Sequence, residues 1–288
     1  MIPAAFAYHR PRSVDEAIAL LAQHREEARV VAGGHSLIPM MKLRLARPAH
    51  LLDLQDLDEL RGIHSEPGAV VIGAMTTQHE MISSELLAAE CPIIRETSLQ
   101  IGDPQVRYCG TLGGNVANGD PGNDMPAVMI ALDASYRVKG PQGERDIPAR
   151  DFYRGIYSTT LAEGEILLSV RIATPPVGHG YAYEKQKRKT GDYATAAAAV
   201  VLTMSGGACA SAAIALTNVG PTPLRARAAE AALRDKPLTD VSIAAAANLA
   251  MSICDPAGDQ RGDAEYKTAM AGEMTQRALR TARSRIGH

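Results

Sequence analysis

The sequence predicts an α+β fold with two domains, and three observations lead to this prediction. The chain has 288 residues, which is enough for two domains or for one large domain with an appendage. Strand patterns alternate with capped helix patterns as far as residue 177, whereas the remainder shows three strands followed by alanine-rich helices. The prolines of residues 175–178 favour a linker. We therefore expect domains at residues 1–177 and 178–288.

The first domain opens with a helix signal and short apolar runs. Ser13 and Glu16 have the spacing of a capping box, which predicts a helix to about Gln23. Thr77 is a suitable cap for a later helix. The apolar patterns predict strands at residues 29–32, 51–54, 69–74 and 166–172, helices at 93–101 and 126–132, and a hairpin of residues 136–139 and 144–147 around a turn at 140–143.

The second domain is predicted to be a sheet followed by a helical layer. Residues 194–199 are almost all alanine and would form a helix on propensity alone, but we interpret them as part of a strand. The expected strands cover residues 180–187, 194–204 and 210–217, and the expected helices cover 223–234, 240–253 and 263–285.

Two glycine pairs, Gly33-Gly34 and Gly113-Gly114, are the most informative motifs. Each pair is interpreted as a loop that directly follows a β-type run. A Gly-Gly pair permits positive φ and leaves its N–H groups unobstructed, so successive amides can converge on phosphate oxygens. One such pair is usually only a turn. Two pairs, one of them followed by Asn and Asp, favour a bound diphosphate.

Composition excludes several other classes of function. The net charge of −2 argues against nucleic acid as a partner, because binding to phosphate backbones needs a concentrated basic surface. The four cysteines are far apart and the histidines are scattered, so the spacing predicts no metal site in this chain. Cys109 is expected to be a small buried residue. The N-terminus lacks a secretory pattern, which makes the cytoplasm the expected location.

Beyond these physical arguments, the chain resembles the FAD-binding subunits of molybdenum hydroxylases, the xanthine dehydrogenase family. Within that family it is most similar to the medium subunits of aerobic carbon monoxide dehydrogenases. The similarity covers essentially the whole chain, and it is carried by residues 32–39, 111–115, 119–124, 183–185, 187–196, 216–219 and 266–272.

The resemblance implies a fold and a set of cofactor contacts. The N-terminal part would be an FAD-binding domain of the vanillyl-alcohol-oxidase (PCMH) type, with lobes at about 1–55 and 56–177. The C-terminal part would be a three-stranded antiparallel sheet with a helical bundle. By position, the residues implied to bind FAD non-covalently are Ala32, Gly33, Gly34, His35, Ser36, Leu37, Thr111, Gly113, Gly114, Asn115, Asp124, Leu167, Lys185 and Tyr193.

The roles implied for these residues differ. The two glycine motifs would surround the diphosphate and ribityl chain, and Asp124 would accept a hydrogen bond from the adenosine half. Leu167 would pack on the cofactor, Lys185 would contact it from the second domain, and Tyr193 would lie near the isoalloxazine ring. Lys187, Arg188 and Lys189 are expected to be surface or subunit-contact residues.

The resemblance also implies partners. A large subunit would carry the molybdenum cofactor and oxidise carbon monoxide, and a small subunit would carry two [2Fe–2S] clusters. Electrons would reach FAD in this chain and leave to an external acceptor such as a quinone. The assembly would be a dimer of heterotrimers, cytoplasmic or peripheral at the inner face of the cytoplasmic membrane. This chain would contribute no catalytic acid, base or nucleophile.

Three other functions stay open at this point. The chain could serve a related molybdenum hydroxylase that acts on an aldehyde or an N-heterocycle. It could be a stand-alone FAD oxidase in which His35 holds the flavin covalently, although a hydrogen-bonding loop histidine is the favoured interpretation. It could also be a scaffold that has lost its cofactor.

Overall fold

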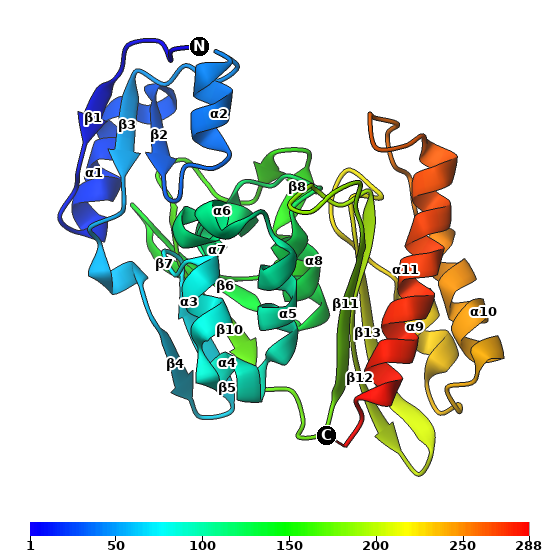
Figure 1. The fold of residues 1–288 in the computed structure, drawn as a ribbon. Helices are drawn as coiled ribbons and strands as arrows, with labels where there is room; N and C mark the ends of the chain where they lie inside the picture. Colours follow the sequence, from blue (N-terminus) through cyan, green and yellow to red (C-terminus); the bar gives the residue numbers. More distant parts are fainter. Residues whose placement is uncertain (288) are drawn as a thin grey trace.

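The computed structural model describes residues 1–287 and confirms the mixed α+β fold. Two lobes occupy the first part of the chain, and a sheet backed by helices follows them (Figure 1). We call residues 7–53 the first lobe, residues 63–173 the second lobe and residues 180–284 the C-terminal unit. Among the described residues, no helix is long and apolar enough to cross a membrane.

The first lobe is a small three-stranded parallel sheet with two helices. Its strands lie in the order β1-β3-β2. Side chains from α1, including Val14, Ala17 and Leu21, pack with Leu52 of β3 in the core of this lobe. The elements are β1 (Ala7–His9), α1 (Val14–His24), β2 (Ala28–Val31), α2 (Leu37–Lys42) and β3 (His50–Asp53).

The second lobe is a five-stranded antiparallel sheet covered by short helices. The strand order is β4-β5-β10-β6-β7. Helix α8 is buried along its whole length, as its unbroken apolar sequence after Asp124 would require. The elements are β4 (Ile63–Glu66), β5 (Ala69–Gly73), α3 (Gln78–Ser83), α4 (Glu85–Glu90), α5 (Pro92–Gln100), α6 (Pro104–Cys109), α7 (Leu112–Ala117), α8 (Asp124–Ala131), β6 (Ser135–Gly140), β7 (Gly143–Pro148), β8 (Tyr153–Gly155), β9 (Ser158–Thr159) and β10 (Ile166–Ala173).

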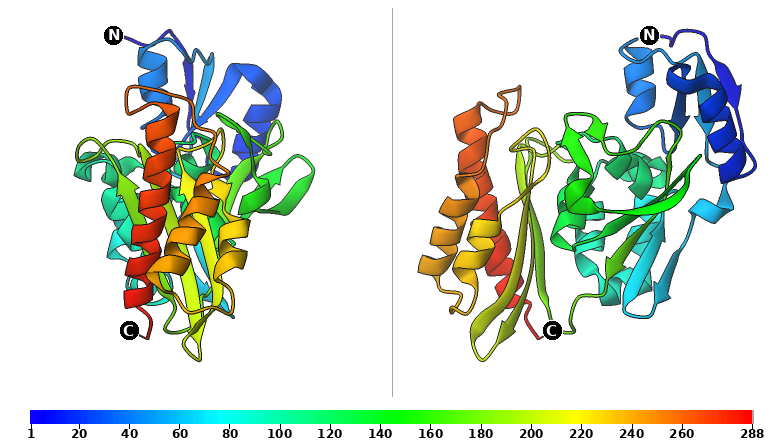
Figure 2. Two further views of the ribbon diagram at one scale, coloured as in Figure 1. Left: turned by 90° about the vertical axis from the view of Figure 1, so that its right-hand side faces the viewer. Right: turned by 180° about the vertical axis from the view of Figure 1, so that it is seen from behind.

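The C-terminal unit is an antiparallel sheet whose two faces pack on different partners. One face lies against the second lobe, and α9, α10 and α11 stand on the opposite side (Figures 1 and 2). The strand order is β11-β12-β13-β14. The elements are β11 (Gly180–Gln186), β12 (Ala196–Ser205), β13 (Ala208–Thr217), β14 (Leu224–Arg225), α9 (Arg227–Leu233), α10 (Asp240–Met251) and α11 (Ala264–Ser284).

The alanine-rich strand β12 is buried on both faces. Ala197 and Ala199 belong to the core shared with the second lobe, whereas Ala196 and Ala198 belong to the core under the helices. The alternation of side chains along a strand explains this division. Because a methyl group adds little thickness to either layer, alanine suits a strand that is covered on both sides.

Several predicted features differ in the structure. Ser13 caps α1, but the Glu16 carboxylate accepts from the N–H of Arg12 instead of completing the box. Residues 224 and 225 form the short strand β14, which adds a fourth strand to the predicted three and delays the expected helix to Arg227. Cys109 is exposed. His9, His24 and His50 lie together, contrary to the prediction that the histidines are scattered.

The predicted domain boundary at residue 177 stays a prediction. Strand β10 ends at Ala173 and β11 begins at Gly180, so residue 177 lies in the connection between them. The hydrophobic core does not stop at that connection, because Tyr183 of β11 packs in the same buried cluster as Met125 of α8.

Candidate cofactor site

A cavity of about 630 Å³ lies where the two lobes and the C-terminal unit meet. This volume falls within the range of roughly 300–1,000 Å³ that is usual for small-molecule and cofactor sites. Every one of the fourteen residues singled out from the sequence lines it, namely Ala32, Gly33, Gly34, His35, Ser36, Leu37, Thr111, Gly113, Gly114, Asn115, Asp124, Leu167, Lys185 and Tyr193. Residues separated by up to 161 positions in the sequence thus share one cavity.

The first glycine pair follows β2 as predicted and forms one wall. Gly34 has a φ of +73°, which other residues rarely adopt. A Cβ on Gly33 would lie 2.2 Å from the carbonyl oxygen of Cys109. The loop therefore needs one glycine for its backbone conformation and the other for its close approach to the end of α6.

The backbone amides of this first loop are available to a ligand. Within residues 1–287, the N–H groups of Gly33, Gly34, His35 and Ser36 donate to no backbone carbonyl. Four consecutive amides without such a partner are a suitable donor set for an anionic group.

The second glycine pair is arranged differently from the prediction. Gly113 and Gly114 lie inside helix α7, which follows helix α6 and not a strand. The N–H of Gly113 donates to the carbonyl of Ala74 at 2.8 Å, and that of Gly114 donates to Thr111 Oγ1 at 3.0 Å. These amides are therefore committed within the protein. Gly113 is required instead by packing, because a Cβ there would lie 2.6 Å from the Cβ of Ala74.

Two asparagines give this second wall its polar character. Asn115 Oδ1 and Asn118 Nδ2 are buried, and neither atom has a hydrogen-bond partner in the part of the chain that the structure describes. Both residues line the cavity. Because buried polar atoms in native proteins are nearly always paired, an acceptor and a donor left open here fit a polar ligand such as a nucleotide.

A buried ion pair stands at the third wall. Lys185 Nζ of β11 lies 2.8 Å from Asp124 Oδ2 at the start of α8, and the two side chains are only 1% and 7% exposed. The Tyr183 hydroxyl donates to the other carboxylate oxygen at 2.5 Å. Burial raises the pKa of Asp124, and the Lys185 ammonium and the hydrogen bonds oppose that rise. The pair places one positive and one negative group at the cavity.

Tyr193 stands near the opening of the cavity, held by an ionic cluster. Its side chain is 41% exposed, and the Arg261 guanidinium lies 5.5 Å from the ring centroid. Asp192 accepts hydrogen bonds from Arg261 and Arg188 at 2.9 Å each. Burial alone would raise the pKa of Asp192, but these guanidinium groups outweigh it and lower the pKa to about 2. The Asp192 carboxylate is thus a negative charge held in place next to Tyr193, whose backbone N–H donates to it.

Apolar side chains complete the walls. Leu167 of β10 is buried, and Leu37 lies beside the first loop, whereas His35 is exposed. Sequence reasoning missed several other lining residues, which are Met40, Leu54, Met75, Gln78, Ile101, Gly102, Val106, Asn118, Tyr157, Leu161 and Asp192. Gly102 had a visible signal, since it directly follows a predicted helix, and Asp192 adjoins a predicted residue. The others had no local signal.

These features fit a dinucleotide flavin. The free amides of residues 33–36 suit a diphosphate, the unpaired asparagine atoms suit hydroxyl or ring-nitrogen partners, and the apolar walls suit a flat ring system.

Comparison with protein families places an FAD-binding domain in this chain. Residues 4–175 match the family described as the FAD binding domain in molybdopterin dehydrogenase. Residues 181–282 match the C-terminal domain of the CO dehydrogenase flavoprotein. Together the two matches cover nearly all of the chain.

Individual relatives are similar over their full lengths. The carbon monoxide dehydrogenase medium chain of Afipia carboxidovorans is 60% identical, with 99% of each chain covered. The corresponding chain of Hydrogenophaga pseudoflava is 51% identical, also with 99% of each chain covered. Among solved structures, reconstituted CO dehydrogenase from Oligotropha carboxidovorans superposes with a TM-score of 0.98 at 60% identity, covering 99% of this chain and 100% of that one.

Proposed function

We propose a function from one premise, that this chain belongs to the family of FAD-binding subunits of molybdopterin dehydrogenases. The chain is the FAD-carrying medium subunit of a molybdenum-containing carbon monoxide dehydrogenase, and its own task is electron transfer. The relatives that support this substrate are carbon monoxide dehydrogenase medium chains that match from end to end.

Different residues of the cavity would bind different parts of the cofactor. The amides of Gly33 to Ser36 would bind the diphosphate, and Asn115 would offer its open oxygen to a polar group of the ribityl or adenosine part. Asp124 would accept from a sugar hydroxyl, because a carboxylate beside a diphosphate would be repelled. Leu167 and Tyr193 would contact the ring system, as their positions on the cavity wall support.

Bound FAD supplies the redox chemistry, since it accepts and releases electrons. The chain's residues hold, orient and shield that group. Lys185 brings positive charge to the cavity, and this charge would favour an anionic reduced isoalloxazine ring over a neutral oxidised one. The adjacent Asp124 limits the effect, because its carboxyl group lies 2.8 Å from the Lys185 ammonium and opposes its charge when ionised. No proton transfer by this chain is needed for the proposed task.

The proposed partners follow from the same family. A large subunit with the molybdenum cofactor would oxidise carbon monoxide with water to carbon dioxide, and a small subunit with two [2Fe–2S] clusters would deliver the two electrons here. Two such heterotrimers would form a dimer. An external acceptor such as a quinone would oxidise the reduced flavin. We propose a cytoplasmic complex, peripheral at the inner face of the membrane.

One experiment separates the proposal from its alternatives. The complex is purified through this chain from cells grown with carbon monoxide, and flavin, iron and molybdenum are measured per chain. Bleaching of flavin absorbance by carbon monoxide, with large and small subunits present, would support the proposal. Metal-bearing partners without bleaching by carbon monoxide would indicate that the complex acts on another substrate, such as an aldehyde or an N-heterocycle.

Two further outcomes would overturn the electron-transfer role. A lone yellow protein whose flavin stays with the acid-precipitated chain would indicate an oxidase with flavin attached at His35, which lines the cavity. A purified chain that neither carries nor takes up FAD would indicate a scaffold. The His35→Ala variant serves as the control for covalent attachment.

A further inference from the structure

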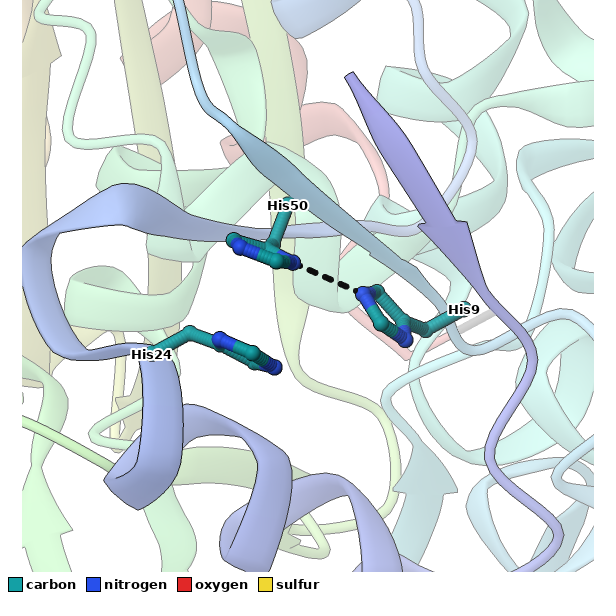
Figure 3. Close-up of side chains that lie close together, drawn as sticks. All are labelled: His9, His24 and His50. Carbon is teal, nitrogen blue, oxygen red and sulfur yellow. Dashed lines mark hydrogen bonds between the residues drawn. The ribbon is translucent and has the colours of Figure 1, made fainter.

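Three histidines of the first lobe lie close together (Figure 3). His9 ends β1, His24 ends α1 and His50 begins β3. His9 Nε2 and His50 Nδ1 are 2.9 Å apart, and the rings of His24 and His50 stack with centroids 3.6 Å apart. None of the three lines the cofactor cavity. The cluster therefore needs an explanation of its own.

The fold brings these side chains together for a definite reason. In the parallel pairing of β1 with β3, Ala7 lies opposite His50 and His9 opposite Leu52, so His9 and His50 share a face of the sheet. Leu52 on that face packs in the core formed with α1. Leu21 of α1 also belongs to that core. Because residues three apart lie on the same face of a helix, His24 lies on the face of α1 that packs against the sheet.

The three side chains of the cluster are all imidazoles. Neutral imidazole offers a nitrogen lone pair, and it is the commonest protein ligand for transition metals. The cluster thus brings together three side chains of the type that transition metals prefer.

The spacing also suits a metal ion. One ligand nitrogen from each histidine lies within 4.8 Å of the other two. A tetrahedral ion with Zn–N bonds of about 2.0–2.1 Å needs nitrogens about 3.3 Å apart. The widest separation would therefore have to close by up to about 1.5 Å, and the nearly parallel rings of His24 and His50 would have to turn so that their lone pairs point at one ion. All three residues are partly accessible to solvent.

We propose that His9, His24 and His50 bind a divalent transition-metal ion that prefers imidazole ligands, with Zn²⁺ as the probe. The ion would join β1, α1 and β3 and leave a fourth position for water. Binding displaces any proton shared between the rings and involves no redox change. The site would stabilise the lobe that also carries the loop of residues 33–36, without touching the cofactor.

The test uses the full chain without a histidine tag, after removal of metals by a chelator. Titration with ZnCl₂ at pH 7.5 should show one equivalent bound, and the affinity should fall at pH 5.5 because protons compete for the rings. His9→Gln, His24→Gln and His50→Gln should each weaken binding by at least about tenfold, since even indirect supports of metal ligands matter 10- to 100-fold. Co²⁺ at the same site should develop visible absorption bands.

A matched control separates this site from adventitious binding. His64 is exposed on β4 and outside the cluster, so His64→Gln should keep the affinity of the unmodified chain. Thermal unfolding with and without Zn²⁺ shows whether each variant folds, and the Zn²⁺-dependent rise in Tm should vanish only in the cluster variants. Absence of binding at millimolar Zn²⁺, or equal binding by all variants, would overturn the proposal.

Discussion

Lys185 Nζ of β11 and Asp124 Oδ2 of α8 form an ion pair of 2.8 Å that joins the C-terminal unit to the second lobe. Both side chains are almost fully buried, and both residues line the cofactor cavity. A single contact therefore belongs to the packing between two parts of the chain and also to the proposed site. Substitutions at this pair should change stability and cofactor affinity together.

We expect Lys185→Met to destabilise the apo chain by about 3–5 kcal/mol, because it leaves the buried Asp124 carboxylate without its cation. The double variant Asp124→Asn with Lys185→Met should recover much of that loss. Urea unfolding of the apo chain measures both. An unchanged unfolding free energy in the single variant would show that the pair contributes nothing to packing.

Gly33→Ala should weaken FAD binding by at least about tenfold and destabilise the chain by about 1–3 kcal/mol. The reason is steric, since the new methyl group would meet the Cys109 carbonyl oxygen and push the loop away from α6. Gly155→Ala is the matched control, because its nearest neighbour would be 4.0 Å away. FAD titration by flavin fluorescence and thermal unfolding should separate the two variants clearly.

Asn115→Ala tests the unpaired acceptor in the cavity. Removal of a buried oxygen that has no partner in the described chain should leave apo stability nearly unchanged, whereas FAD affinity should fall about tenfold if that oxygen accepts from the cofactor. Asn248→Ala, on the exposed side of α10, should alter neither quantity. Equal FAD affinity in both variants would remove Asn115 from the proposed site.

Asp192 predicts a particular dependence of stability on pH. Its pKa is lowered from 3.8 to about 2, so its contribution is complete above the unfolded value and is lost as the pH falls toward 2. Asp192→Asn should cost about 2 kcal/mol at pH 7, as expected for charged hydrogen bonds. The stability difference between the two proteins should narrow below pH 4. A difference that stays constant there would contradict the assignment.

The sequence was sufficient for features that depend on neighbours along the chain. The hairpin of β6 and β7, the Thr77 cap and the strand β12 are confirmed, because turn residues, capping side chains and strand alternation act locally. All fourteen candidate residues line one cavity, and the family resemblance, more than spacing, selected them. Their individual contacts with FAD stay predictions.

Other features depend on contacts that the sequence does not display. Gly113 and Gly114 lie in helix α7 and not in a loop after a strand, because they pack against Ala74 and Thr111; their contact with FAD stays a prediction. His9, His24 and His50 meet only through the parallel register of β1 with β3 and the position of α1. Likewise, the cavity residues Ile101 and Tyr157 occupy positions set by tertiary packing alone.

Strand β12 separates two layers of the protein, the helices on one face and the second lobe on the other. Ala196 and Ala198 fix how closely the helices approach the sheet, whereas Ala197 and Ala199 fix how closely the sheet approaches the second lobe. Neighbouring positions in one strand thus control two different gaps. Larger side chains at Ala196 and Ala198 would move the helical layer and spare the cofactor cavity. Larger side chains at Ala197 and Ala199 would instead shift Lys185 relative to Asp124. Members of the family should accordingly differ in side-chain size more often at positions 196 and 198 than at positions 197 and 199.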